Sequence, residues 1–137
     1  MSLEENKGLF RRWIEAWNTS KDERIDEFFT DTAVAHLPMP PPDEIRGLEN
    51  VKQWHTAFAR GFPGNQVTIE DMIAEGDRLV ARCVFQGMQS GAMGDIPASN
   101  REVTLPFIVI FRIKNGKIAE FWEHFDTHGL LRQIGAV

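Results

Sequence analysis

The stretch EVTLPFIVIFRIKNGKIAEFWEHFD, residues 102–126, decides the fold class of this chain. It contains two runs of extended pattern, Glu102–Ile113 and Lys117–Asp126, separated by the pair Asn115-Gly116, which favours a tight β-hairpin turn. The middle of the first run is apolar at odd and even positions alike, which is typical of a central strand covered on both faces. The stretch therefore predicts a hairpin at the centre of a sheet.

Two further strands are predicted immediately before this hairpin. Residues 66–74 and 79–86 show the same period of two, and Gly76-Asp77 supplies a second tight turn. Residues 87–100 are rich in Gly, Ser and Ala and predict a long loop, of a length that often lines a binding site. The second half of the chain is thus expected to form an antiparallel meander.

The start of the chain shows a helical period instead. Its apolar residues recur at i, i+3, i+4 and i+7, and the pattern ends near Asn18-Thr19-Ser20. Asp22 is a suitable cap for a shorter second helix, which Asp31-Thr32 ends. The apolar positions are Phe10, Trp13, Ile14 and Trp17 in the first helix and Ile25, Phe28 and Phe29 in the second.

A third helix is predicted after a short extended segment. Residues 33–36 form a brief strand, and the proline-rich run 38–42 imposes an open surface loop or pocket rim. The third helix begins after Gly47 and stops at Phe62-Pro63-Gly64-Asn65. Its buried face is expected to contain Val51, Trp54, His55, Phe58 and Phe62.

Helices followed by a meander predict an α+β fold. We expect a single domain, residues 1–137, in which three N-terminal helices pack on one face of a curved, mainly antiparallel β-sheet and enclose a pocket for a small, largely apolar or aromatic ligand. The opposite face of the sheet also needs cover, which predicts a homodimer through that face.

Composition and motifs exclude several classes of function. The net charge is −5 and the basic residues are scattered, which argues against nucleic acid as a partner. Cys83 has no second cysteine to pair with, and no basic leader or membrane-length apolar run occurs, so a cytoplasmic protein without a membrane segment is expected. His124 and His128 have a spacing that suits a metal only on a helix, so neither a metal site nor a cofactor is predicted.

Strand 117–126 carries a column of polar side chains on one face. Alternation places Glu120, Trp122, His124 and Asp126 together, and a tryptophan in that set suggests the wall of a cavity. A carboxylate against aromatic rings has a raised pKa and can exchange protons near neutral pH, which makes Asp126 a candidate acid or base. Asp126 is an equally good N-cap for a C-terminal helix, and the spacing leaves both roles open.

Several aromatic and histidine side chains are candidate substrate contacts. His55 lies on a buried helical stripe, where a histidine is more often a hydrogen-bonded core residue than a proton carrier. His36 precedes the proline run and either points into the cavity or lies at the surface. Aromatic residues on helices are more often core than ligand platform, but four tryptophans leave room for both roles. The candidate contacts are Trp17, His36, Trp54, His55, Phe58, Phe107 and Trp122.

From about residue 30 onward the chain resembles the SnoaL-like polyketide cyclases, a family in the nuclear-transport-factor-2-like superfamily of cone-shaped α+β domains. Two pieces are fairly specific, E-G-D-R at 75–78 and G-K-I-x-E-x-W-x-x-x-D at 116–126. The other residues that carry the resemblance are Gly47-Leu48-Glu49, Phe62-Pro63, Ala74, residues 79–82, Arg112 and residues 130–135.

The resemblance implies a reaction and a residue for it. In the family's cyclases an aspartate matching Asp126 is the acid/base residue of an intramolecular aldol closure that uses no metal or cofactor. Where the family commonly has a Thr-His pair, this chain has Met88-Gln89, so two possible substrate contacts are missing. The chain also has no tyrosine, which makes the related ketosteroid isomerase and scytalone dehydratase activities improbable.

Three functions remain open from the sequence. The first is a cofactor-free lyase or isomerase acting on a polyketide-like or other carbonyl compound, with Asp126 as base and His124 or His55 assisting. The second is a carrier or sensor that binds a small molecule in the same pocket without turnover. The third is a structural dimerisation domain whose pocket is filled by large side chains.

Overall fold

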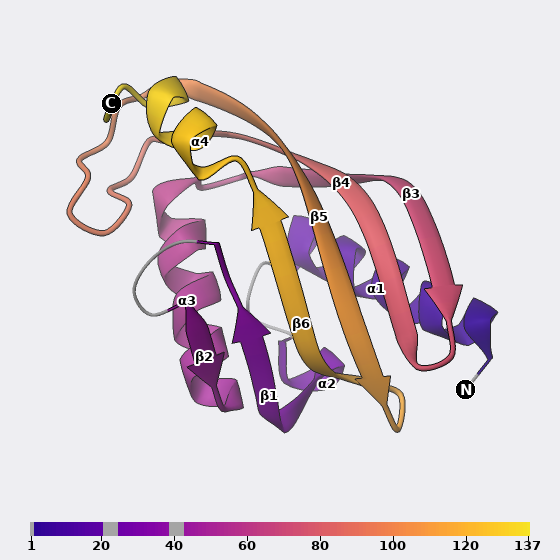
Figure 1. Cartoon of the computed structure of the whole chain (residues 1–137). Coiled ribbons are helices and arrows are strands. Elements are labelled where there is room, and N and C mark those ends of the chain that lie inside the picture. The colour runs from indigo at the N-terminus through magenta and orange to yellow at the C-terminus, as the bar shows by residue number, and fades with distance from the viewer. Residues whose placement is uncertain (1, 21–24, 39–42) are drawn as a thin grey trace.

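The structure is a computed structural model that describes residues 2–20, 25–38 and 43–137 (Figure 1). The first half of the chain contains α1, α2 and α3 with the strands β1 and β2 between α2 and α3, and a meander of long strands forms most of the second half. In chain order the elements are α1 (Leu3–Ser20), α2 (Ile25–Phe28), β1 (Phe29–His36), β2 (Glu44–Arg46), α3 (Leu48–Gly61), β3 (Gln66–Glu75), β4 (Arg78–Met88), β5 (Glu102–Lys114), β6 (Lys117–Phe125) and α4 (Thr127–Gln133).

The six strands form one mixed sheet in the order β2-β1-β6-β5-β4-β3. All neighbouring pairs are antiparallel except β1 and β6, which run parallel. The hairpins at Gly76-Asp77 and Asn115-Gly116 are present, and positive φ angles at Gly76, Asn115 and Gly116 suit their turns. The predicted α+β fold is confirmed.

The structure differs from the sequence prediction in the region between α2 and α3. The second helix ends at Phe28, and β1 begins directly at Phe29 rather than at Ala33. The three residues of β2 were not predicted, and they pair with the end of β1. The expected cap Asp22 and residues 39–42 of the proline run lie outside the described residues.

Three helices cover one side of the curved sheet, as Figure 1 shows for α1, α2 and α3. The stripe on α1 is buried: Phe10 contacts Phe111 of β5 with ring centroids 4.9 Å apart, and Trp13 contacts Phe29 of β1 at the same distance. Edge-to-face pairs of this kind add to the burial of apolar area. Aromatic rings therefore join α1 to the centre of the sheet, and the Asn18 amide, which donates to the carbonyl of Val67 at 2.9 Å, adds a polar contact to β3.

The loop between β4 and β5 is organised by the fully buried Gln89. Its side-chain amide donates to the carbonyl of Pro97 at 3.1 Å, and its Oε1 accepts from the backbone N–H of Ser99 at 3.0 Å. The loop also docks on the end of α3, where the N–H of Gly91 donates to the carbonyl of Gly61 at 3.2 Å. Gln89 therefore supports the loop and the position of α3.

We expect Gly91→Ala to destabilise the protein by about 1–3 kcal/mol, because a Cβ at this position overlaps the backbone carbonyl oxygen of Arg60, which cannot rotate away. Urea unfolding measures the change. Ser90→Ala, at the exposed neighbouring residue, is the control and should stay within about 0.5 kcal/mol of wild type. Equal stabilities for the two variants would contradict the close docking of this loop on α3.

Candidate functional site

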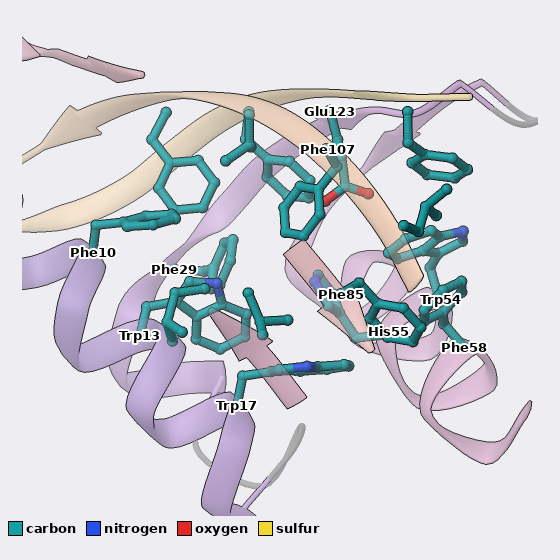
Figure 2. A pocket seen from close by; sticks show the side chains of 17 residues that line it. Phe10, Trp13, Trp17, Phe29, Trp54, His55, Phe58, Phe85, Phe107 and Glu123 are labelled. Atoms are coloured by element: carbon teal, nitrogen blue, oxygen red, sulfur yellow. The ribbon is translucent and has the colours of Figure 1, made fainter. Parts of the chain in front are cut away.

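A cavity of about 70 Å³ lies between the helices and the inner face of the sheet (Figure 2). All but two of its lining residues are aromatic or aliphatic, and the two polar ones are His55 and Glu123. The lining residues are Phe10, Trp13, Ile14, Trp17, Phe29, Trp54, His55, Phe58, Val67, Phe85, Leu105, Phe107, Val109, Phe111, Phe121, Glu123 and Phe125.

The cavity has a closed end and a mouth. Most of its lining residues are buried, and these include all that α1 contributes. The lining residues that keep partial exposure are Trp54 and Phe58 of α3, Phe107 of β5, and Glu123 and Phe125 of β6. These five side chains therefore mark where the cavity approaches solvent.

Glu123 lies at this mouth because of the alternation in β6. Phe121, Glu123 and Phe125 share the inner face of the strand, and all three line the cavity. Figure 2 shows the Glu123 carboxylate directed into the space between the sheet and helix α3. Among the described residues, Glu123 has no hydrogen-bond or ion-pair partner.

The surroundings of Glu123 disfavour its charged form. Removal from water among apolar side chains raises the pKa of its carboxyl from 4.5 to about 7. At neutral pH such a group is divided between acid and carboxylate, so it is able both to accept and to donate a proton. A buried carboxyl with a perturbed pKa in a cavity is a candidate functional group on physical grounds.

His55 is the second polar group of the cavity and is buried on α3. Its Nδ1 lies 2.9 Å from the carbonyl oxygen of Val51, which only accepts, so Nδ1 carries the hydrogen of this bond. Aromatic rings contact His55 on several sides at centroid distances of 5.2–6.0 Å: Trp13, Trp17, Phe29, Trp54 and Phe121.

The prediction that the other column of β6 faces the cavity is wrong. Trp122 lies on the outer face of the sheet, where His36 stacks on it with centroids 5.1 Å apart and Arg78 lies over the ring at 5.2 Å. His36 itself contacts Glu120 at 2.6 Å, which together with Arg112 lowers the pKa of the Glu120 carboxyl. The indole is thus covered by His36 and Arg78 and does not line the cavity.

Asp126 and His124 are also placed away from the cavity. Both residues are exposed, and neither is among the lining residues. The Asp126 carboxylate accepts a hydrogen bond from the N–H of Gly129 at 2.8 Å and is the N-cap of α4. The expected place of Asp126 on the cavity wall is therefore wrong, and of its two anticipated roles the structure contains the capping contact.

The remaining predicted contacts converge on the cavity from different elements. Trp17 lines it from α1, Trp54, His55 and Phe58 from α3, and Phe107 from β5. Trp17 is oriented by its indole N–H, which donates to Oδ1 of Asn65 at 2.8 Å. The sequence analysis missed Glu123, although its alternation with Phe121 and Phe125 was visible.

In the described ranges, no three metal-ligating side chains lie close enough together to hold an ion. Among the same residues, no helix has the length and apolar character needed to span a membrane.

The sequence model of the SnoaL-like polyketide cyclases matches residues 7–134. The chain belongs to this family. A cyclase of Streptomyces peucetius, aklanonic acid methyl ester cyclase DnrD, is 29% identical over 134 residues that cover 93% of this chain and 88% of the relative. The corresponding cyclase DauD of Streptomyces sp. (strain C5) is 28% identical over 129 residues, 93% of this chain and 80% of the relative.

Solved structures of similar proteins share the fold. TsrD from Streptomyces laurentii has a TM-score of 0.86 and 30% identity, with 100% of this chain and 99% of that chain covered. IdmH from Streptomyces antibioticus has a TM-score of 0.80 and 26% identity, with coverage of 95% and 98%. The SnoaL-like fold is thus established across the described residues.

Met88-Gln89 stands where the family resemblance implies a Thr-His pair, and the structure shows the contacts of Gln89. The Gln89 amide is bonded to the backbone of its own loop. Neither Met88 nor Gln89 lines the cavity.

We expect Glu123 to make the stability of the protein depend on pH. Its pKa is higher in the folded than in the unfolded state, so the folded protein binds more protons between about pH 4.5 and 7. Over this range wild type should lose about 1–2 kcal/mol relative to Glu123→Gln as pH rises, a value reduced for the partial exposure of the side chain.

Urea unfolding at several pH values measures this difference. The same substitution at exposed Glu102 serves as the control for loss of a negative charge. A constant difference between wild type and Glu123→Gln from pH 4 to 8 would contradict the raised pKa.

Proposed function

We propose that the protein catalyses a polyketide cyclase reaction of the lyase or isomerase type, the intramolecular aldol closure of a small, largely apolar carbonyl compound, with Glu123 as the acid/base residue. The observation that carries the proposal is a carboxyl with a pKa of about 7 in a cavity otherwise lined by apolar side chains and His55. A group of this pKa transfers protons efficiently near neutral pH.

The reaction needs one proton to be taken and one to be returned. The Glu123 carboxylate removes a proton from a carbon next to a carbonyl group, which leaves an enolate and the neutral acid. The enolate carbon attacks a second carbonyl carbon of the same molecule, so that a carbon–carbon bond closes a ring and the attacked oxygen becomes an alkoxide. A proton returned from the acid converts the alkoxide into a hydroxyl group and restores the carboxylate.

The cavity supports this chemistry through its polarity and shape. Apolar walls exclude water, which strengthens the interaction of charged intermediates with the few polar groups present. His55 is the second proton-transfer group in the proposal. Its hydrogen bond from Nδ1 to the Val51 carbonyl oxygen fixes the tautomer of the neutral ring. Trp17, Trp54, Phe58 and Phe107 provide the surfaces on which the ligand packs.

Asp126 is the rival candidate for the acid/base role. The family resemblance implies the role for Asp126, which the sequence analysis paired with His124 or His55, whereas the geometry favours Glu123. Asp126 is exposed, its carboxylate is engaged in capping α4, and it does not line the cavity, whereas Glu123 does.

Aklanonic acid methyl ester is the reasonable first compound to assay. The curated relatives are aklanonic acid methyl ester cyclases, and the matches cover most of both chains. At 28–29% identity the substrates of relatives can differ, so a panel of polyketide esters and smaller diketones should accompany it.

We expect Glu123→Gln to lower turnover by about 10²–10⁴, the usual contribution of an acid/base residue. Asp126→Asn, which keeps a capping side chain, should retain turnover within about threefold of wild type. Formation of the cyclised product, followed by chromatography and mass spectrometry, measures both variants. A large loss in Asp126→Asn with an active Glu123→Gln would return the role to Asp126.

A second candidate function is a small-molecule carrier or sensor of the same fold. The small volume of the cavity, about 70 Å³, favours it over an enzyme that accommodates a large substrate. Saturable binding of a polyketide ester with no product at any pH, unchanged by Glu123→Gln, would select this function.

We also propose that the chain forms a homodimer through the outer face of the sheet. Cα partners across neighbouring strands place Ile73, Val80, Ile110 and Trp122 in one row on this face. Ile73 and the nearby Ile108 are 64% and 47% exposed, respectively, which is unusual for large apolar side chains on a sheet. A second copy of the chain would bury this row.

We expect wild type to have the mass of a dimer at micromolar concentration and Ile108→Glu to shift it towards the monomer, because two copies would bring unpaired carboxylates together in an apolar interface. Light scattering coupled to size exclusion measures the mass. Val137→Glu, an exposed apolar residue at the C-terminus, is the control. A monomeric wild type would contradict the proposed interface.

A further inference from the structure

The cavity as it stands is too small for the ligands that its chemistry suits. A cavity of roughly 150 Å³ admits one benzene ring, and pockets for drug-sized ligands have about 300–1,000 Å³. The volume here is about 70 Å³. A ligand with even one aromatic ring therefore requires that a lining side chain move, and the question is which one.

The two sides of the mouth differ in how firmly they are held. On the sheet side, Phe107 and Phe125 are Cα partners across the β5–β6 ladder, and Glu123 lies two residues before Phe125. Phe107 lies on β5, which pairs with β4 and β6, and the end of β6 that carries Glu123 and Phe125 pairs with β5. The opposite side is the stacked pair Trp54 and Phe58 on α3, with ring centroids 5.5 Å apart and planes inclined by 18°.

Within this pair, Trp54 is held less firmly than Phe58. Phe58 also contacts Phe62 at 5.2 Å and Phe85 of β4 at 5.3 Å, which tie it to the core. In the described part of the chain, the ring contacts of Trp54 are with Phe58 and His55, both on its own helix. Its indole N–H has no hydrogen bond to another described residue.

We propose that Trp54 is the gate of the cavity and the residue that limits the size of the ligand. Rotation of the Trp54 side chain away from Phe58 opens the cavity beside Glu123. It also uncovers the face of the Phe58 ring on which Trp54 stacks. A flat aromatic or conjugated carbonyl compound then occupies the space between α3 and the Phe107–Phe125 pair. The inference rests on the proposed function only in placing the ligand in this cavity, and it concerns access and not proton transfer.

Binding of two neutral aromatic ketones tests the gate. Acetophenone has one ring and 2-acetonaphthone has two, and isothermal titration calorimetry gives their Kd values. We expect Trp54→Ala to bind 2-acetonaphthone at least about tenfold more tightly than wild type, because no side chain has to be displaced. Acetophenone should gain affinity by a smaller factor, because its single ring requires a smaller displacement. Leu3→Ala, an exposed residue of α1 outside the cavity, should leave both Kd values unchanged.

Indole N–H resonances of ¹⁵N-labelled wild type give an independent readout if Trp54→Ala folds poorly, and Trp54→Phe is the second variant. The chain has four tryptophans, of which Trp13, Trp17 and Trp54 line the cavity and Trp122 does not. On titration with 2-acetonaphthone, the Trp54 signal should move most and the Trp122 signal least. Trp54→Phe should give a gain in affinity between wild type and Trp54→Ala.

The outcomes separate the gate from the proposed reaction. An unchanged ratio of the two Kd values in both Trp54 variants, or a larger shift at Trp122 than at Trp54, would overturn the gate. The gate is measured by ketone binding and the reaction by turnover, so loss of the enzymatic proposal leaves the gate standing. A gate that fails while Glu123→Gln still loses turnover would leave the reaction standing.

Discussion

The register of β6 against β5 is the constraint on which the site depends. Phe107 pairs with Phe125 and Val109 with Glu123, so the inner face of the hairpin carries the side chains that enclose the cavity. Because successive side chains point to opposite faces, a slip of one residue would exchange Glu123 for Trp122 and place the carboxyl outside. The irregularity between Arg112 and Ile113 lies near the turn, away from these pairs, and leaves their alternation undisturbed.

Placing Glu123 in an apolar cavity favours its reactivity but lowers the stability of the fold. An apolar cavity contributes to folding through the burial of its aromatic walls, whereas the Glu123 carboxyl among them is deprived of water without a compensating partner in the part of the chain that the structure describes. Proteins keep such unfavourable groups mainly where a function needs them. The surrounding core, which joins α1, α3 and the inner face of the sheet, is large enough to offset one group of this kind.

The sequence predicted the local structure better than the site. Alternation and the turn pairs identified β3 to β6 because these strands pair with their neighbours in the chain. The parallel pairing of β1 with β6 joins segments far apart in the chain, and β2 is too short to leave a pattern. The face of β6 that points inward was misassigned because both faces carry aromatic residues. Trp122 is covered by His36 and Arg78, which come from other strands and could not be inferred from β6 alone.

The state of Cys83 has a practical consequence. It is the sole cysteine of the chain, it is fully buried, and removal from water raises the pKa of its thiol to about 12. Maleimides and other alkylating reagents attack the thiolate, which is scarce and inaccessible here. A cysteine introduced at a surface position can therefore be labelled selectively without replacing the native one. Single cysteines introduced around the mouth of the cavity can thus carry a spin label or a fluorophore at one chosen position at a time.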